Sequence, residues 1–247
     1  MLSNQSCMVL TKSNILLAFI ILLCVSFTLF QVQEEFYISA VSRALIVPLI
    51  TVLYFMNTRD RSLYFSWFLL FFSISELIVF TEYFLQTGKQ LHVYYFVGNL
   101  LYILAYLSLL IDIIKGLNFK KVFKNYKLQL FVLGVLNIYI VYMLLSIVNP
   151  IIKNTNWIYL ELIYNTVILL LLTFSLISYF YNDNKKTLLC FIATLFIVFS
   201  EFVQIAYFYI SDKNMLNFIS TFLFVMAFGF YYFYARTRSV KTFRLFN

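Results

Sequence analysis

The chain has 247 residues, of which 63% are hydrophobic, 21% are aromatic and only 11% are charged. Soluble domains are closer to half apolar and about a quarter charged, so the composition excludes a soluble globule and predicts an integral membrane protein. The net charge of +8 comes from short loops and not from a basic stripe, so we expect no nucleic-acid partner. Because no Cys-x-x-Cys or Cys/His cluster occurs, we expect no bound metal and no cofactor.

Eight apolar runs are each long enough, at about 17 to 25 residues, to cross a hydrocarbon core of roughly 30 Å as a helix. The runs lack the period-two alternation of a membrane β-barrel. In chain order, the predicted spans are 14–30, 37–56, 63–85, 91–114, 128–148, 157–181, 188–210 and 215–235. The sequence therefore predicts an all-α membrane protein with eight transmembrane helices, forming a single polytopic domain over residues 1–247.

The basic residues concentrate in alternate connections between the predicted spans. Of the 18 Lys and Arg residues, 14 lie before the first span, after residue 235, or in the loops 57–62, 115–127 and 182–187. By the positive-inside rule, these segments and both termini are predicted to be cytoplasmic. The lysine-rich loop 115–127 can form a short amphipathic segment on anionic headgroups, or it can serve only as a topological signal.

Two acidic residues lie deep inside apolar spans. An ionisable group in hydrocarbon costs roughly 2.5 kcal/mol or more, so such residues are candidates for a functional site. The aligned sets are Leu70, Phe71, Ser75 and Glu76 in the third span, and Leu195, Phe196, Ser200 and Glu201 in the seventh. This match indicates a possible parallel repeat of four plus four helices, with both glutamates at one depth, slightly outward of the midplane.

Helical periodicity places polar side chains on shared faces of five spans. The stripes are Ser39 and Arg43; Ser66, Ser73 and Glu76; Tyr95, Asn99, Tyr102 and Tyr106; Glu161 and Asn165; and Thr194, Glu201 and Gln204. Together these stripes predict a polar cavity that opens toward the outer leaflet. By contrast, Trp157 and Tyr209 lie near span ends and are interpreted as interfacial belt residues.

Two interpretations of the glutamates remain open. In the first, Glu76 and Glu201 are hydrogen-bonded or Arg-paired groups that hold helices together, at about 0.6 to 2 kcal/mol per contact. In the second, they form a catalytic pair, in which a protonated carboxyl group donates a proton beside an ionised one. The candidate substrate-binding residues are then Arg43, Tyr102, Tyr106, Glu161 and Gln204.

The chain resembles the YhhN-type lysoplasmalogenase family over nearly its whole length. The segments that carry the resemblance are Ser42-Arg43-Ala44-Leu45 with Pro48, Ser73-Ile74-Ser75-Glu76, Gly98 to Tyr106, Tyr164, and Ala193 through Ser200-Glu201. The family has an aspartate where this chain has Glu76 and Glu201. The resemblance implies hydrolysis of the vinyl-ether bond of a lysoplasmalogen, with Glu76 and Glu201 as the catalytic pair and Arg43 binding the substrate phosphate.

We therefore expect membrane lipid and a lysophospholipid substrate as partners. The alternatives are a small proton- or cation-coupled transporter and a catalytically inactive lipid-binding membrane protein. Richness in Asn, Lys, Ile, Phe and Tyr suggests an AT-rich bacterial genome, and hence a bacterial inner membrane. The sequence leaves the oligomeric state open.

Overall fold

The computed structural model describes residues 2–82, 85, 88–148, 155–211 and 213–237. Within these ranges the secondary structure is entirely helical, with no strand. The helices are α1 (Leu2–Val32), α2 (Phe36–Asn57), α3 (Leu63–Glu82), α4 (Gly88–Lys115), α5 (Phe119–Asn125), α6 (Lys127–Val148), α7 (Thr155–Asn182), α8 (Lys185–Tyr209) and α9 (Asn214–Arg236). Eight of them, all but α5, are long and apolar enough to cross a membrane, which confirms the predicted all-α membrane class.

The predicted spans agree with these helices to within a few residues, except at two helix ends. The first helix begins at Leu2 and not at 14, because no Gly or Pro interrupts the segment before it. The third helix is described to Glu82, and the predicted continuation to 85 crosses positions 83 and 84, which lie outside the described residues. The basic residues beyond 237 lie outside them too.

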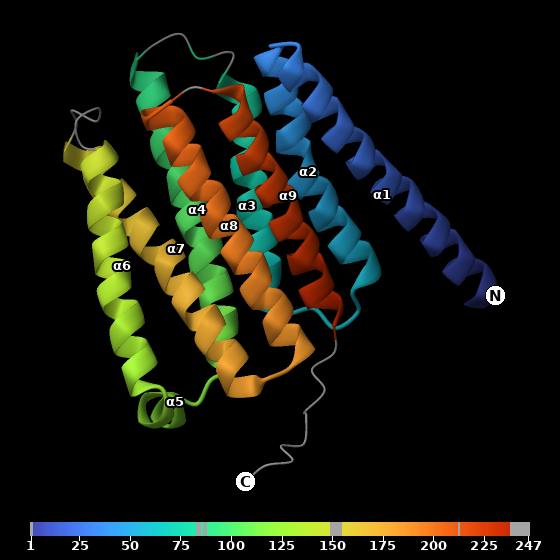
Figure 1. Cartoon of the computed structure of the whole chain (residues 1–247). Helices are drawn as coiled ribbons and strands as arrows, with labels where there is room; N and C mark the ends of the chain where they lie inside the picture. The colour runs from blue at the N-terminus through green and yellow to red at the C-terminus, as the bar shows by residue number, and fades with distance from the viewer. Residues whose placement is uncertain (1, 83–84, 86–87, 149–154, 212, 238–247) are drawn as a thin grey trace.

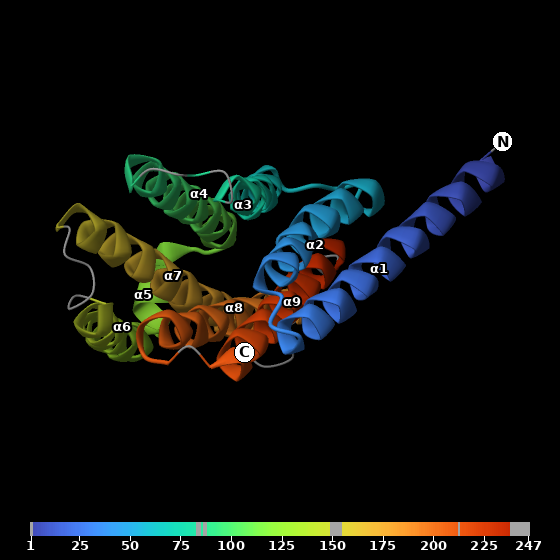
Figure 2. The same cartoon turned by 90° about the horizontal axis from the view of Figure 1, so that it is seen from above.

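Six helices form a closed ring. α2 contacts α3, α3 contacts α4, α4 contacts α7, α7 contacts α8, α8 contacts α9, and α9 contacts α2. The remaining two long helices lie outside this ring, α1 against α2 and α6 against α7. Seen from above, α1 and α6 occupy opposite sides of the bundle (Figure 2). The start of α1, the end of α9 and α5 lie toward the same end of the bundle, opposite the α1–α2 connection (Figure 1).

Apolar side chains face outward from the bundle, as expected for a protein whose solvent is lipid. On α6, Phe131 is 70% exposed and Ile138 is 73% exposed, while α1 exposes Ile15 and Leu22. The interior is filled largely by aromatic rings, among them the fully buried Phe68 and Phe228. This arrangement supports a membrane-embedded bundle, because a soluble protein would bury such residues.

Hydroxyl groups connect neighbouring helices inside the apolar bundle. Ser75 on α3 donates to the carbonyl oxygen of Gly98 on α4 at 3.0 Å. Ser200 on α8 donates to the carbonyl oxygen of Ser220 on α9 at 2.8 Å. Each of these serines precedes a candidate catalytic glutamate, so each hydrogen bond fixes the helix turn that carries the carboxylate.

The lysine-rich loop between the fourth and fifth spans contains the short helix α5. Asn118 caps its N-terminus by accepting from the backbone N–H of Lys121 at 3.3 Å. Val122 is fully buried in a small apolar cluster with Ile177 of α7, whereas Phe123 is exposed. α5 is thus an amphipathic helix attached to the bundle by one face, as the spacing of its apolar residues predicts.

Candidate active site

A cavity of about 350 Å³ lies inside the six-helix ring. Every helix of the ring contributes to it; the lining residues are Ala40, Arg43, Phe72, Glu76, Val79, Tyr94, Tyr95, Asn99, Tyr102, Glu161, Tyr164, Glu201, Gln204, Ile205, Phe208, Tyr209 and Phe224. Tyr94 lies near the start of α4, and Tyr209 is the last residue of α8. The cavity therefore extends toward the end of the bundle at which α4 begins and α8 ends.

Glu76 and Glu201 both line this cavity, from α3 and α8. Glu76 is 3% exposed and accepts a hydrogen bond from the Tyr102 hydroxyl at 2.8 Å. Glu201 accepts from the Tyr106 hydroxyl at 3.0 Å and also interacts with the hydroxyl of Tyr164. Each carboxylate is oriented by tyrosine from a facing helix, so both are fixed in position before any ligand binds.

Arg43 of α2 lies within electrostatic reach of both carboxylates. Its Nη2 donates to the side-chain oxygen of Gln204 at 3.2 Å, and its guanidinium carbon lies 4.9 Å from the centre of the Phe224 ring. Its Nε is buried and has no hydrogen-bond partner among the described residues. The guanidinium therefore keeps a donor for an anionic group in the cavity.

Aromatic rings form the inner wall beside the carboxylates. The ring of Phe72 lies 4.8 Å from that of Tyr102, 5.7 Å from that of Tyr106 and 5.8 Å from that of Phe224. The wall is thus apolar where it touches the polar cluster, which excludes water and strengthens the electrostatic interactions inside.

Glu161 of α7 lies on the side of the cavity nearer its open end. It accepts a hydrogen bond from Tyr95, whose ring stacks on Trp157 at 4.4 Å. Tyr209 lines the cavity and interacts with Tyr95. Tyr209, interpreted as a belt residue because it lies at a span end, therefore also forms part of the cavity wall.

The structure brings six of the seven predicted site residues into one cavity, namely Arg43, Glu76, Tyr102, Glu161, Glu201 and Gln204. Tyr106 does not line the cavity itself, but its hydroxyl reaches Glu201 from behind. The roles of all seven in catalysis or substrate binding remain predictions. The cavity lining also contains three carboxyl groups, those of Glu76, Glu161 and Glu201, but only one guanidinium group.

Several polar residues that share helix faces with this set do not line the cavity. Ser39 donates to Gln31 of α1 at 2.7 Å, because the start of α2 packs on α1 there. Ser73 pairs with Thr51 at 2.7 Å, and Thr194 pairs with Tyr231 at 3.0 Å. The Ser73 and Thr194 hydroxyl groups hold ring helices together, and the Ser39 hydroxyl group holds α1 against α2, so the prediction that these three residues face the cavity is wrong.

The contribution of α9 to the cavity could not be predicted from the sequence. Phe224 supports the Arg43 guanidinium, but α9 is so rich in phenylalanine that no spacing marks this ring. Tyr164 was singled out by the family resemblance alone. A signal that would have helped is its spacing of three residues from Glu161, which places both on one face of α7.

Among the described residues, no group of three or more His, Cys, Asp or Glu side chains is close enough to hold a metal ion. The polar groups in the cavity can transfer a proton, bind an anionic group at Arg43 and stabilise a cation between the carboxylates. Comparison with known proteins finds no matching family model, no matching curated protein and no matching solved structure.

Proposed function

We propose that this chain is a YhhN-type lysoplasmalogenase that hydrolyses the vinyl-ether bond of a single-chain ether lipid. The observation that carries the proposal is the convergence of Glu76, Glu201 and Arg43 in one membrane-embedded cavity. An apolar wall beside a few convergent polar groups is the usual form of a site for an amphipathic ligand. At about 350 Å³, the cavity is also within the size range of small-molecule sites, roughly 300 to 1,000 Å³.

The chemistry needs two carboxyl groups in different protonation states. A protonated carboxyl group gives its proton to the vinyl carbon farther from the ether oxygen, and this produces an oxocarbenium ion. The ionised carboxylate stabilises that cation and takes a proton from the attacking water, forming a hemiacetal. As the hemiacetal collapses to an aldehyde, the second carboxyl group gives the proton that it took from water to the departing glycerol oxygen, and the hemiacetal hydroxyl gives its proton to the first carboxylate. Both carboxyl groups thereby return to their starting states. Because the pair shares its protons, neither Glu76 nor Glu201 is assigned specifically as the proton donor or as the ionised carboxylate.

Arg43 is suited to the phosphate of the same substrate. Its buried Nε lacks a partner among the described residues, and a phosphate oxygen would supply one. Four further residues would help to position the substrate. Hydrogen bonds connect Tyr102 to Glu76, Tyr106 to Glu201, and Gln204 to Arg43. The fourth residue, Glu161, lines the same cavity.

The proposal includes a bacterial inner-membrane location with both termini in the cytoplasm. The supporting observation is that the basic loop after α2, the lysine-rich helix α5 and the start of α8 lie at one end of the bundle, away from the cavity (Figure 1). The positive-inside rule assigns that end to the cytoplasm, so the cavity opens toward the outer leaflet.

The helix contacts also support the proposed parallel repeat of α1–α4 and α6–α9. The contacts α1·α2, α2·α3 and α3·α4 in the first half correspond to α6·α7, α7·α8 and α8·α9 in the second. The contacts between halves are reciprocal as well, since α4·α7 corresponds to α9·α2. Such a pattern is expected when two similar halves are related by an axis along the membrane normal.

The alternative of a proton- or cation-coupled transporter is favoured by one observation, the excess of carboxyl groups in the cavity. Glu76, Glu161 and Glu201 face a single guanidinium, so charge neutrality in hydrocarbon requires additional protons or a bound cation. Groups that must take up and release cations are typical of transport pathways.

An assay of the purified protein tests the hydrolase. We expect wild-type protein to release fatty aldehyde from a lysoplasmalogen, detected by mass spectrometry. The matched saturated alkyl-ether lysophospholipid should release none, since it has no vinyl carbon to protonate. Failure to release aldehyde in lipid nanodiscs would contradict the hydrolase, and equal aldehyde release from both lipids would point to a different reaction.

Proteoliposomes test the transporter. If the protein is the proposed hydrolase, an imposed cation or proton gradient should not dissipate faster in proteoliposomes than in empty liposomes, as reported by a pH-sensitive dye. Accelerated proton flux that Glu76→Gln abolishes would favour the transporter. Absence of both flux and aldehyde release would favour the inactive lipid-binding protein.

A further inference from the structure

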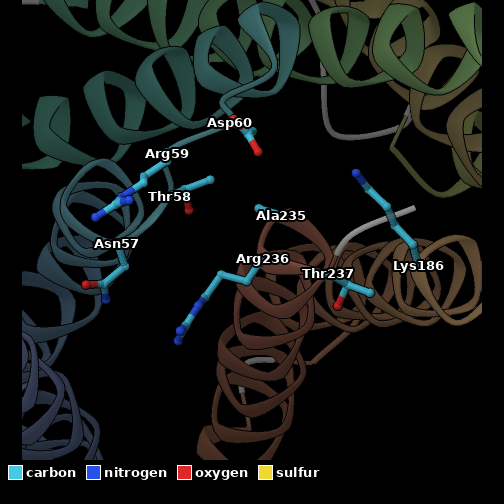
Figure 3. A pocket seen from close by; sticks show the side chains of 8 residues that line it. All are labelled: Asn57, Thr58, Arg59, Asp60, Lys186, Ala235, Arg236 and Thr237. Atoms are coloured by element: carbon cyan, nitrogen blue, oxygen red, sulfur yellow. The ribbon is translucent and has the colours of Figure 1, made fainter. Parts of the chain in front are cut away.

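A second cavity, of about 420 Å³, lies at the opposite end of the bundle from the candidate active site. It is formed where the end of α2, the first turn of α8 and the end of α9 meet; the lining residues are Asn57, Thr58, Arg59, Asp60, Lys186, Ala235, Arg236 and Thr237. Figure 3 shows these side chains around the open space, with Arg59 and Lys186 on opposite sides of it.

The charge of this lining is positive. The lining has three basic residues, Arg59, Lys186 and Arg236, and one acidic residue, Asp60, which leaves an excess of two positive charges. The three cations come from three separate segments of the chain. A topological signal explains basic residues at this end of the bundle, but it does not require that basic residues of three separate segments line one cavity.

The cations are held in place by their surroundings. Nη1 of Arg236 donates to the Tyr232 hydroxyl at 3.2 Å, and the same hydroxyl accepts from Nδ2 of Asn57 at 2.9 Å. The Lys186 ammonium lies 5.1 Å from the centre of the Tyr234 ring. Arg61 donates from Nε to the carbonyl oxygen of Thr58 at 2.9 Å, which fixes the loop that carries Arg59.

A buried polar group in the lining has no partner. Thr58 is 7% exposed, and its hydroxyl oxygen is buried without a hydrogen-bond partner among the described residues. Leaving a buried hydroxyl without a partner is unfavourable, and because Thr58 lines the cavity, a ligand oxygen there can supply the partner once the side chain rotates. This observation is independent of the charges.

We propose that the cavity is a binding site for a phosphate-bearing anion. The guanidinium groups of Arg59 and Arg236 suit the oxygens of a phosphate, Lys186 adds a point charge, and the Thr58 hydroxyl donates to one oxygen after rotation about its Cα–Cβ bond. The headgroup of an anionic phospholipid and a free phosphate compound share this chemistry. The proposal does not rest on the hydrolase activity.

Binding to the full-length protein in neutral detergent tests this site. Native mass spectrometry measures retention of phosphatidylglycerol against zwitterionic phosphatidylcholine, and calorimetry measures binding of inorganic phosphate. The cavity variant combines Arg59→Gln, Lys186→Gln and Arg236→Gln. The control variant combines Lys120→Gln, Lys121→Gln and Lys124→Gln on α5; it removes the same charge from exposed side chains that line no part of this cavity.

We expect the wild type to prefer phosphatidylglycerol or to bind inorganic phosphate. The cavity variant should lose at least about tenfold in affinity, and the control variant less than about twofold. Loss for phosphatidylglycerol alone identifies a lipid headgroup, while loss for inorganic phosphate identifies a soluble anion. Equal losses in the two variants, or no binding of either probe by the wild type, would overturn the proposal.

Thr58→Val keeps the site testable if the triple variant fails to fold. Valine has the shape of threonine and removes only the hydroxyl, which has no partner in the described residues. We expect unchanged or higher thermal stability and binding several-fold weaker than in the wild type. Unchanged binding would overturn the proposed site, because the Thr58 hydroxyl is one of the groups that the site requires as a ligand.

Discussion

Replacing Glu76 or Glu201 by glutamine is expected to lower aldehyde release from a lysoplasmalogen by about 10²- to 10⁴-fold, the usual loss when a general acid or base is removed. Glutamine keeps the volume of each side chain and still accepts from the Tyr102 or Tyr106 hydroxyl, so the cavity retains its shape. The rate is measured with both variants in nanodiscs at saturating substrate.

Glu35→Gln is the matched control for this experiment. Glu35 is an exposed carboxylate in the α1–α2 connection and makes no side-chain hydrogen bond to the N-terminus of α2. It should retain wild-type activity. If Glu76→Gln and Glu201→Gln also retain it, the two carboxylates have no catalytic role and instead hold helices together. If only one of the two variants loses activity, the shared-proton mechanism is wrong.

Phe228→Ala is expected to be the most destabilising apolar substitution in the bundle interior, at about 3 to 5 kcal/mol. The fully buried Phe228 ring lies 4.7 Å from that of Phe72, 4.9 Å from that of Phe224 and 5.8 Å from that of Phe68. Its removal leaves a void behind the cavity wall that the neighbouring rings cannot fill. The free energy of unfolding in mixed micelles gives the measurement.

Phe233→Ala on the same helix provides the comparison. Phe233 is 56% exposed on the outer face of α9, so its loss should cost less than about 0.5 kcal/mol. Equal destabilisation by the two substitutions would show that the interior aromatic cluster does not dominate the packing of α9 against α3.

The helices could be predicted from the sequence because length and hydropathy alone define a membrane span. The five charged or amide residues of the predicted site, Arg43, Glu76, Glu161, Glu201 and Gln204, all line one cavity, as expected from the cost of exposing such groups to lipid. Hydroxyl groups carry no such constraint. The hydroxyl groups of Ser73 and Thr194 form hydrogen bonds with neighbouring ring helices. Their position on the same helix face as a glutamate therefore did not determine whether they line the cavity.

Two other features were beyond sequence reasoning for a different reason. The place of Phe224 beneath Arg43 depends on which helices adjoin, and the contact of α9 with α2 joins segments at opposite ends of the chain. The basic cavity likewise combines loop 57–60 with the ends of α8 and α9. Short-range periodicity contains no information about such long-range neighbours.

The six-helix ring that encloses the cavity is built from helices of both halves of the chain, which are held together by contacts between helices. Three of its helices, α2, α3 and α4, precede α5, and the other three, α7, α8 and α9, follow α6. Glu76 and Arg43 belong to the first group and Glu201 to the second. Neither half of the chain contains a complete polar cluster, so two fragments divided near α5 would have to assemble side by side before either carboxylate met its counterpart.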